Sequence, residues 1–268
     1  MKTDLEENLK KKIKKYISNY YILNPVFNPG LETFKEENPD KKVVIVLYTN
    51  GIDSTYCLLK ELEKGNFVIP IYNRLNCECF TDKFSLIEYT LIHNISLLRT
   101  KFSNLEPLQL NVSSQVHLLS SFTFYQQVYN AISIFTIGYD ILQYVDEVIM
   151  GIVMHDSSIS YTSEIKTIFN NSIKMIPNVE ESLKISLKFP LLKTTKDIVY
   201  SRLKKLMEKH KVNLKLVSCE NPNVFNQLNK DGNLEIEIKP CEKCGSCVCN
   251  ENNNIKLKPI KMISKKTN

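Results

Sequence analysis

The sequence lacks any apolar run that approaches the roughly 18 consecutive residues of a membrane-spanning helix. Its N-terminus also lacks the apolar segment at the centre of a secretory signal peptide. Neither a serine–histidine–aspartate arrangement nor a reactive-cysteine arrangement can be recognised. These absences predict a soluble, cytoplasmic protein without a membrane partner, and they argue against catalysis through a side-chain nucleophile.

A basic body is absent as well, although the formal net charge is +6. Six lysines and three acids give residues 1–15 a charge of +3, and five lysines without an acid give residues 254–268 a charge of +5. The residues between these ends therefore carry about −2, which argues against a nucleic-acid-binding face. We expect both ends to be solvated tails, and a polyanion-binding arm is the alternative.

The chain is organised around a short polar loop, Tyr48-Thr49-Asn50-Gly51-Ile52-Asp53-Ser54-Thr55. It follows the apolar, β-branched run Val43–Leu47, which is typical of a buried parallel strand, and it leads into a helix expected over Thr55–Lys64. A strand that turns into a helix in this way gathers free backbone N–H groups at the positive end of a helix dipole. The loop is therefore predicted to bind phosphate.

The residue types in the loop suit that role. Gly51 has no Cβ, and Asn50 is among the residues that best tolerate a positive φ, so a phosphate can approach the backbone. Ser54 and Thr55 supply hydroxyl groups at the helix start. Asp53 would repel a phosphate unless a cation lay between them, which predicts that it faces Mg²⁺. The alternative is an ordinary corner in which Asp53 or Ser54 caps the helix.

The flanking segments predict the surrounding fold. Helical spacing of apolar residues favours a helix over Leu5–Ile22, which we expect to pack on the main domain, and Asn24–Asp40 is typical of a linker. After the loop helix we expect a strand over Phe67–Tyr72, a helix over Asp82–His93 and a strand over Ile95–Arg99.

This alternation predicts an α/β fold, a Rossmann-like parallel sheet with helices on both faces. Ligands of such sheets bind beyond the carboxyl ends of the strands, where Asn50 and Asn73 would both lie. Tyr72 and Asn73 are therefore expected to contact adenine or ribose. An exposed strand end without a ligand is the alternative interpretation.

The middle of the chain predicts a second wall of the ligand site. Residues 101–121 are interpreted as a loop over the site, Phe124–Tyr144 as one long helix, and Glu147–Met150 as a strand. That strand opens into the polar segment Gly151–Ser158. By analogy with the first loop, this segment is expected to face the ligand.

A lysine marks the next helix start. Lys184–Phe189 alternates as a strand, and Thr194 or Thr195 is expected to cap a helix that runs to about His210. Lys196 would then lie in the first turn, where a cation is unfavourable unless an anion neutralises it. We expect Lys196 to reach an ATP phosphate, and a plain surface lysine is the alternative.

Cysteines near the C-terminus predict a metal site. Cys241, Cys244 and Cys247 recur at three-residue intervals around a glycine, and Cys219 follows a strand expected over Leu214–Val217. Three thiolates on a tight turn and a fourth from a neighbouring segment are typical of structural, tetrahedral zinc. Cys249 is an alternative to Cys247 as the fourth ligand, and an iron–sulfur cluster is an alternative to zinc.

The order of these motifs resembles a known family. Thr49–Ser54 is similar to the S-G-G-x-D-S pyrophosphate loop of the N-type ATP pyrophosphatases, whose fold is adenine nucleotide α-hydrolase-like. With the C-x-x-C-x-x-C motif at Cys241–Cys247, the chain resembles the 7-cyano-7-deazaguanine synthase (QueC) family over residues 42–250. Gly151–Ser158 is similar to that family's G-x-x-x-x-D-x-S segment. The family's P-G-R-N segment has no counterpart with an arginine in Phe124–Asn130.

The resemblance implies ATP, Mg²⁺ and Zn²⁺ as cofactors. It implies that ATP activates a carboxylate, that of 7-carboxy-7-deazaguanine, as an acyl-adenylate, and that ammonia or another amine displaces AMP to give an amide or a nitrile. The implied sites are catalytic Asp53 and Lys196; nucleotide-binding Thr49, Asn50, Gly51, Ile52, Asp53, Ser54, Thr55, Tyr72 and Asn73; substrate-binding Asp156 and Ser158; and zinc-binding Cys219, Cys241, Cys244 and Cys247.

The corresponding domain organisation has four parts. We expect an N-terminal helix and linker over residues 1–41, an ATP pyrophosphatase domain over 42–210, a zinc-binding region over 211–250 and a basic tail over 251–268. A homodimer is one expected assembly.

Three other functions are considered. The first is an antiviral-defence enzyme that transfers the activated deazaguanine to a protein amine, for which Leu5–Ile22 would dock the partner. The second is a non-catalytic nucleotide-binding zinc module. The third is another pyrophosphate-loop enzyme, such as one that modifies tRNA, although the body has no excess of basic residues for that.

Overall fold

The structure is a computed structural model that describes residues 2–23, 30–75, 81–113, 123–154, 156–176, 184–217, 223–228, 234–243, 245–252 and 255–264. Its centre is a five-stranded parallel sheet with the strand order β3-β2-β1-β4-β5. The strands are β1 (Val43–Leu47), β2 (Phe67–Leu75), β3 (Gln109–Ser113), β4 (Glu147–Ile149) and β5 (Ser186–Lys188). The α/β class and the parallel sheet are thus confirmed.

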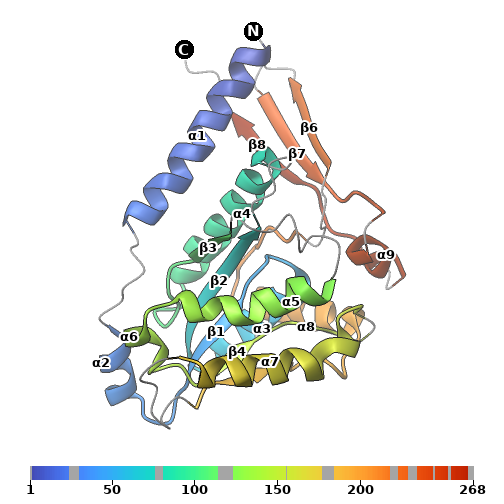
Figure 1. Ribbon diagram of the computed structural model, residues 1–268. Coiled ribbons are helices and arrows are strands. Elements are labelled where there is room, and N and C mark those ends of the chain that lie inside the picture. The colour runs from blue at the N-terminus through green and yellow to red at the C-terminus, as the bar shows by residue number, and fades with distance from the viewer. Residues whose placement is uncertain are drawn as a thin grey trace.

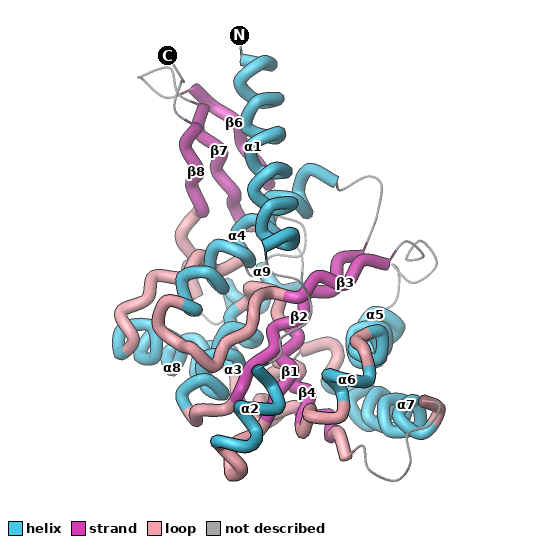
Figure 2. The backbone as a smooth tube through the Cα atoms, turned by 90° about the vertical axis from the view of Figure 1, so that its left-hand side faces the viewer, coloured by secondary structure: helices cyan, strands magenta, loops and turns pink. Residues whose placement is uncertain are grey.

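Helices cover both faces of this sheet, as Figure 2 shows. One face is covered by α3 (Ile52–Glu63), α4 (Thr81–Arg99) and α8 (Lys196–Lys209), and the other by α2 (Gly30–Glu37), α5 (Thr123–Ile132), α6 (Tyr139–Leu142) and α7 (Thr162–Lys174). Two short 3₁₀ helices, η3 (Ser133–Thr136) and η4 (Ile159–Tyr161), join these elements.

Strand β1 explains why both faces need a cover. All five of its residues are buried. Val44 and Val46 belong to the hydrophobic core under α3, α4 and α8, whereas Val43, Ile45 and Leu47 belong to the core under α2, α5 and α7. Successive side chains of a strand point to opposite faces, so an uninterrupted apolar run fits only a strand that is packed on both sides.

A second, smaller layer stands beside the parallel sheet (Figure 1). Strands β6 (Asn223–Leu228), β7 (Leu234–Lys239) and β8 (Ile260–Ser264) form an antiparallel sheet in the order β6-β7-β8. Helix α9 (Gly245–Asn252) lies between β7 and β8 in the sequence. Helix α1 (Lys2–Leu23) packs on α4 and on this sheet, and its Leu9 and Ile13 are buried with Ile238 and Ile260.

Four secondary-structure predictions are wrong. Ile95–Arg99 is the end of α4 rather than a strand, because Leu91, Ile95 and Leu98 continue one buried helical stripe. The third strand is instead β3, inside the stretch interpreted as a loop. The helix expected over residues 124–144 is divided into α5, η3 and α6. Residues 214–217 are irregular, because their N–H groups bond to loop and side-chain oxygens rather than to a strand.

Both ends of the chain are more ordered than expected. Residues 24–40 were interpreted as a linker, but residues 30–37 of that stretch form α2. Residues 24–29 lie outside the described part of the chain. The C-terminal stretch expected to be a solvated tail contributes β8, where Lys261 pairs with Glu235 of β7 at 2.8 Å. Acids on a neighbouring strand therefore neutralise part of the basic charge.

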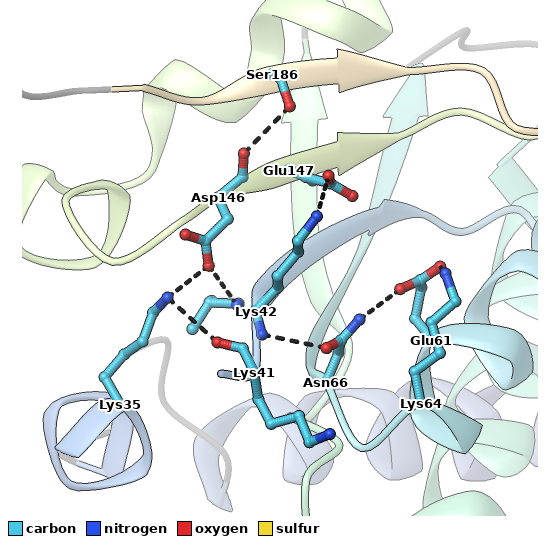
Figure 3. Close-up of polar contacts among 10 residues, drawn as sticks. Lys35, Lys41, Lys42, Glu61, Lys64, Asn66, Asp146, Glu147 and Ser186 are labelled. Carbon is cyan, nitrogen blue, oxygen red and sulfur yellow. Dashed lines mark hydrogen bonds and ion pairs between the residues drawn. The ribbon is translucent and has the colours of Figure 1, made fainter. Parts of the chain in front are cut away.

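Polar contacts tie the elements together at the amino ends of the strands (Figure 3). Asp146 Oδ2 accepts hydrogen bonds from Lys35 Nζ at 2.6 Å and from Val43 N at 2.8 Å, which joins α2 to β1. Asn66 accepts from Lys42 N at 3.1 Å and donates to Glu61 at 2.7 Å. The amino ends thus have a structural role, and the carboxyl ends are left for ligands.

Candidate functional site

The candidate site lies at the carboxyl ends of β1 and β4. These neighbouring strands form the switch point of the sheet, since the chain builds outward from β1 toward β3 and then from β4 toward β5. Ligands of open parallel sheets bind in the crevice at such a point. The N-terminus of α8 joins it, because Met154 N donates to Thr194 O at 3.0 Å.

The loop after β1 presents only part of its sequence to the outside. Thr49 is exposed, and Gly51 and Asp53 are partly exposed. Asn50, Ile52 and Thr55 have no exposed surface. Asn50 has the expected positive φ, 62°. The direct ligand contacts expected of Asn50, Ile52 and Thr55 are therefore not available, because tertiary neighbours cover these residues.

Ser54 supports the loop from inside. It is 5% exposed, and its Oγ accepts a hydrogen bond from Thr49 N at 3.2 Å and lies 3.2 Å from Thr49 Oγ1. The hydroxyl predicted to donate to phosphate is thus engaged with the strand end. This arrangement fixes Thr49 and Ser54 relative to each other on the two sides of Gly51.

Two glycines of the site differ in what their missing side chains leave room for. A Cβ on Gly51 would meet nothing closer than Thr49 Oγ1 at 3.5 Å, and φ is −75° there. A Cβ on Gly151 would lie 2.9 Å from the Asp53 carbonyl carbon and 3.0 Å from Ser54 N. Gly151 is therefore needed for packing, whereas a methyl group on Gly51 would make only ordinary van der Waals contacts.

Asp53 and Lys196, from the starts of α3 and α8, meet in the site. Lys196 Nζ lies 3.6 Å from Asp53 Oδ2, and their side chains are 6% and 15% exposed. Burial raises the pKa of Asp53 to about 6, the charge of Lys196 opposes this rise, and Asp156 adds to it. Asp53 Oδ1 is buried without a hydrogen-bond partner among the described residues. Lys196 therefore lies beside the loop that is predicted to bind phosphate, and its contact with an ATP phosphate stays a prediction.

The second loop contributes Asp156. Its Oδ1 accepts a hydrogen bond from Ser158 N at 2.8 Å, which orients the carboxylate at the start of η4. Ser158 itself is only 1% exposed. Ser158 therefore supports Asp156 through its main chain, and the direct substrate contact expected of the Ser158 side chain is not available. His155, which precedes Asp156 in the sequence, lies outside the described residues.

The end of β2 forms another wall, made of amides. Tyr72 is 7% exposed, and Asn73 is half-buried. Asn73 Nδ2 donates to Asn130 Oδ1 at 3.2 Å, and Ser133 Oγ donates to Asn73 Oδ1 at 3.0 Å. Asn73 thus holds α5 against the sheet at the carboxyl edge.

The residues present fit a magnesium–nucleotide complex. Mg²⁺ is commonly held by one or two carboxylates together with substrate phosphates. Asp53 offers a buried oxygen without a partner among the described residues, Asp156 offers a second carboxylate nearby, and Gly51 has no side chain that would cover the backbone of the loop. Lys196 adds a cation at the same place. Bound there, Mg²⁺ would neutralise phosphate charge beside the two carboxylates.

The cysteines fit zinc as far as they are described. The sulfur atoms of Cys241 and Cys247 are 4.0 Å apart, close to the spacing of about 3.8 Å that tetrahedral bonds of 2.3 Å impose. Glu242, at the turn between them, has a φ of 61°. Cys219 and Cys244 lie outside the described residues, and within these no group of three or more metal-ligand side chains occurs.

Sequence reasoning missed Thr90 and Asn94 of α4, which contact the loop. Asn94 Nδ2 donates to Asn50 Oδ1 at 2.6 Å, and Asn50 Nδ2 donates to Thr90 Oγ1 at 3.2 Å. Both residues are fully buried. The available signal was a pair of polar residues on the same face of α4 as Leu91 and Leu98, where an apolar residue would be expected.

No protein-family model matches this chain, and a search of curated protein sequences finds no relative. None of the helices in the described part of the chain combines the length and the apolar character that crossing a membrane requires. The site must therefore be interpreted from its own geometry.

The two glycines give a test of this geometry. We expect Gly51→Ala to change the melting temperature by less than about 3 °C, because the new methyl group meets only ordinary contacts. Gly151→Ala should lower the free energy of unfolding by about 1–3 kcal/mol, because its methyl group overlaps the backbone of α3. Thermal and urea unfolding measure both. Equal stability of the two variants would contradict the close approach at Gly151.

A second test uses the titration of Asp53. Its pKa is about 6 in the folded protein against an ordinary value of 3.8, so the folded state retains the proton to a higher pH than the unfolded state. The contribution of Asp53 to stability therefore falls as the pH rises from about 4 to about 6. One pKa unit corresponds to about 1.4 kcal/mol, which sets an upper limit of about 3 kcal/mol.

The comparison variant is Asp53→Asn, which does not titrate. The free energy of unfolding of the unmodified protein, minus that of the variant, should fall by about 1–3 kcal/mol between about pH 4 and pH 7. Urea unfolding without added Mg²⁺ measures this difference. A difference that rises with pH would mean that the pKa is lowered, and the description of the site would then be wrong.

Proposed function

We propose that the protein is an ATP-dependent carbon–nitrogen ligase of the 7-cyano-7-deazaguanine synthase type. The observation that carries this proposal is the approach of Lys196 to Asp53, in the loop that contains Gly51, at the switch point of a parallel sheet. Asp53 and Lys196 were assigned to nucleotide binding from two separate segments of the sequence. Their convergence supports one phosphate site.

The proposed reaction has two transfers. A carboxylate oxygen of the acid substrate attacks the α-phosphorus of ATP and pyrophosphate leaves, which gives an acyl-adenylate. The nitrogen of ammonia or another amine then attacks the acyl carbon, and AMP leaves with the bonding electron pair while the nitrogen loses a proton. In a QueC-like enzyme the acid is 7-carboxy-7-deazaguanine, and a second ATP drives conversion of the amide to a nitrile.

The residues are suited to positioning and to neutralising charge. Lys196 would balance negative charge on the transferred phosphoryl group, and Asp53 with Asp156 would bind the cation that accompanies ATP. Ser54 and Ser158 of the site are buried, and Cys57 is buried inside α3, so none of these three is exposed to act as a nucleophile. This composition suits an adenylating enzyme, in which the substrate's own oxygen attacks.

A protein amine is the second acceptor class considered. It would require a docking surface, and α1 had been the candidate. Leu9, Ile13 and Tyr20 of α1 are buried against the rest of the chain, so its apolar face is already used. Ammonia or a small amine is therefore the acceptor that we propose, and transfer to a protein is an outcome that the assay below would reveal.

The test is release of AMP and pyrophosphate from ATP with Mg²⁺, with and without 7-carboxy-7-deazaguanine and ammonia, followed by mass spectrometry of the products. We expect release that depends on the acid, with an amide or nitrile as the product. Lys196→Met and Asp53→Ala should lower the rate by at least 100-fold, because charge stabilisation at the reacting phosphate is lost.

Exposed neighbours provide matched controls. Lys193→Met and Asp197→Ala alter the same charges within a few residues of the site, at positions open to solvent, and should retain the rate within about twofold. Stimulated release without a small-molecule product would indicate another acceptor. ATP binding without any AMP would overturn the ligase proposal and favour a non-catalytic nucleotide module.

We also propose that Zn²⁺ is held by Cys219, Cys241, Cys244 and Cys247. Cys241→Ser and Cys247→Ser should each lose the metal and unfold at a lower temperature, because binding of structural zinc supplies folding free energy on the order of 10 kcal/mol. Cys249→Ser is the control and should retain zinc. Metal analysis and thermal unfolding measure these effects. Loss of zinc in Cys249→Ser but not in Cys247→Ser would mean that Cys249, rather than Cys247, is the fourth ligand.

A further inference from the structure

Asn50 has a side chain whose hydrogen-bonding capacity is completely used inside the protein. Its Oδ1 accepts from the Tyr48 hydroxyl at 2.9 Å and from Asn94 Nδ2 at 2.6 Å. Its Nδ2 donates to Lys215 O at 2.6 Å and to Thr90 Oγ1 at 3.2 Å. A primary amide has two donors and two acceptor positions. No capacity remains for a ligand, so Asn50 must act through the protein.

Asn94 provides a second side-chain bond to the carbonyl group of Lys215. Its Nδ2 also donates to Lys215 O at 3.0 Å, and its Oδ1 accepts from Lys215 N at 3.0 Å. In addition, Val217 N donates to Asn50 O at 2.9 Å. Residues 214–217, which we call the strap, are thereby bonded to the loop through both side-chain and main-chain groups.

The backbone of Asn50 explains what the bonds accomplish. Its φ of 62° is a left-handed conformation that most residues avoid, and it turns the chain from β1 into the N-cap of α3 at Gly51. Gly51 follows directly and Asp53 lies two residues further on, and both are partly exposed at the site. A fully bonded, wholly buried side chain at Asn50 therefore fixes the direction in which these two residues face.

We propose that Asn50 is a positioning residue, and that Asn94 and the strap hold the phosphate loop in its nucleotide-binding shape through it. This inference rests on the proposed function for the identity of the ligand. Glycine would adopt the same φ without strain but would form none of the side-chain bonds. Asparagine at this position thus joins the loop to α4 and to the strap, a link that glycine cannot provide.

The test separates the backbone angle from the hydrogen bonds. Asn50→Gly keeps the angle and removes the side-chain bonds of Asn50, and Asn94→Ala keeps Asn50 and removes the bonds that Asn94 forms with Asn50 and Lys215. We expect both variants to bind MgATP at least tenfold more weakly than the unmodified protein in calorimetry. Hydrogen exchange of the amides in residues 51–55 should be faster in both, because the loop is no longer held.

Asn66→Ala is the matched control. Asn66 is also a buried, bonded asparagine, 7% exposed, but it lies at the amino ends of the strands (Figure 3). Its substitution should destabilise the fold and leave both the affinity for MgATP and the exchange of residues 51–55 unchanged. An effect on affinity that only follows global stability would therefore appear in this control as well.

The outcomes distinguish the two proposals. Tenfold weaker binding and faster loop exchange in Asn50→Gly and Asn94→Ala, with Asn66→Ala unaffected, support the positioning role. Unchanged affinity and unchanged loop exchange in Asn50→Gly overturn it, because the backbone angle alone would then suffice. If the unmodified protein does not bind MgATP, the proposed function fails. Hydrogen exchange of residues 51–55 would then still test the positioning role, because unchanged exchange in Asn94→Ala would show that Asn94 does not hold the loop.

Discussion

A carboxylate and an ammonium group, both largely withdrawn from water, face each other at the starts of α3 and α8. Removing such charges from water is costly unless partners compensate. The rest of the site holds this pair in place: Gly151 lets β4 approach α3, and the bond from Met154 to Thr194 holds α8 beside them. One oxygen of Asp53 has no hydrogen-bond partner among the described residues, and this supports the proposal that a cation binds there.

Local signals predicted the centre of the fold but not its edges. The run Val43–Leu47 was recognisable as a buried strand because it is continuously apolar. The helix that starts at Lys196 was recognisable from the polar residues at its start. Ile95–Arg99 was interpreted as a strand because a short apolar run fits either structure until its neighbours are known. β8 was missed because its one lysine, Lys261, is matched by acids on β7, which only tertiary pairing brings beside it.

The sequence indicated which charged residues lie at the site, but only partly which residues form its surface. Asp53 was identified as an anion in a predicted phosphate loop and Lys196 as a cation at a helix start, and the structure brings them within 3.6 Å. Thr55 and Ser158 were expected to contact ligands, yet both are buried. Burial at a loop depends on what packs above it, and here Asn94 and the strap come from distant parts of the sequence. No local pattern encodes that cover.

The packing of α1 has a consequence for how the chain assembles. Leu9 and Ile13 share a core with Ile236 of β7 and Ile260 of β8, so α1 is synthesised well before part of the residues that it packs on. The parallel sheet and α4 can form before those residues emerge. Docking of α1 on the antiparallel layer is therefore expected to be a late event, and an unfinished chain on the ribosome would expose this apolar face to chaperones.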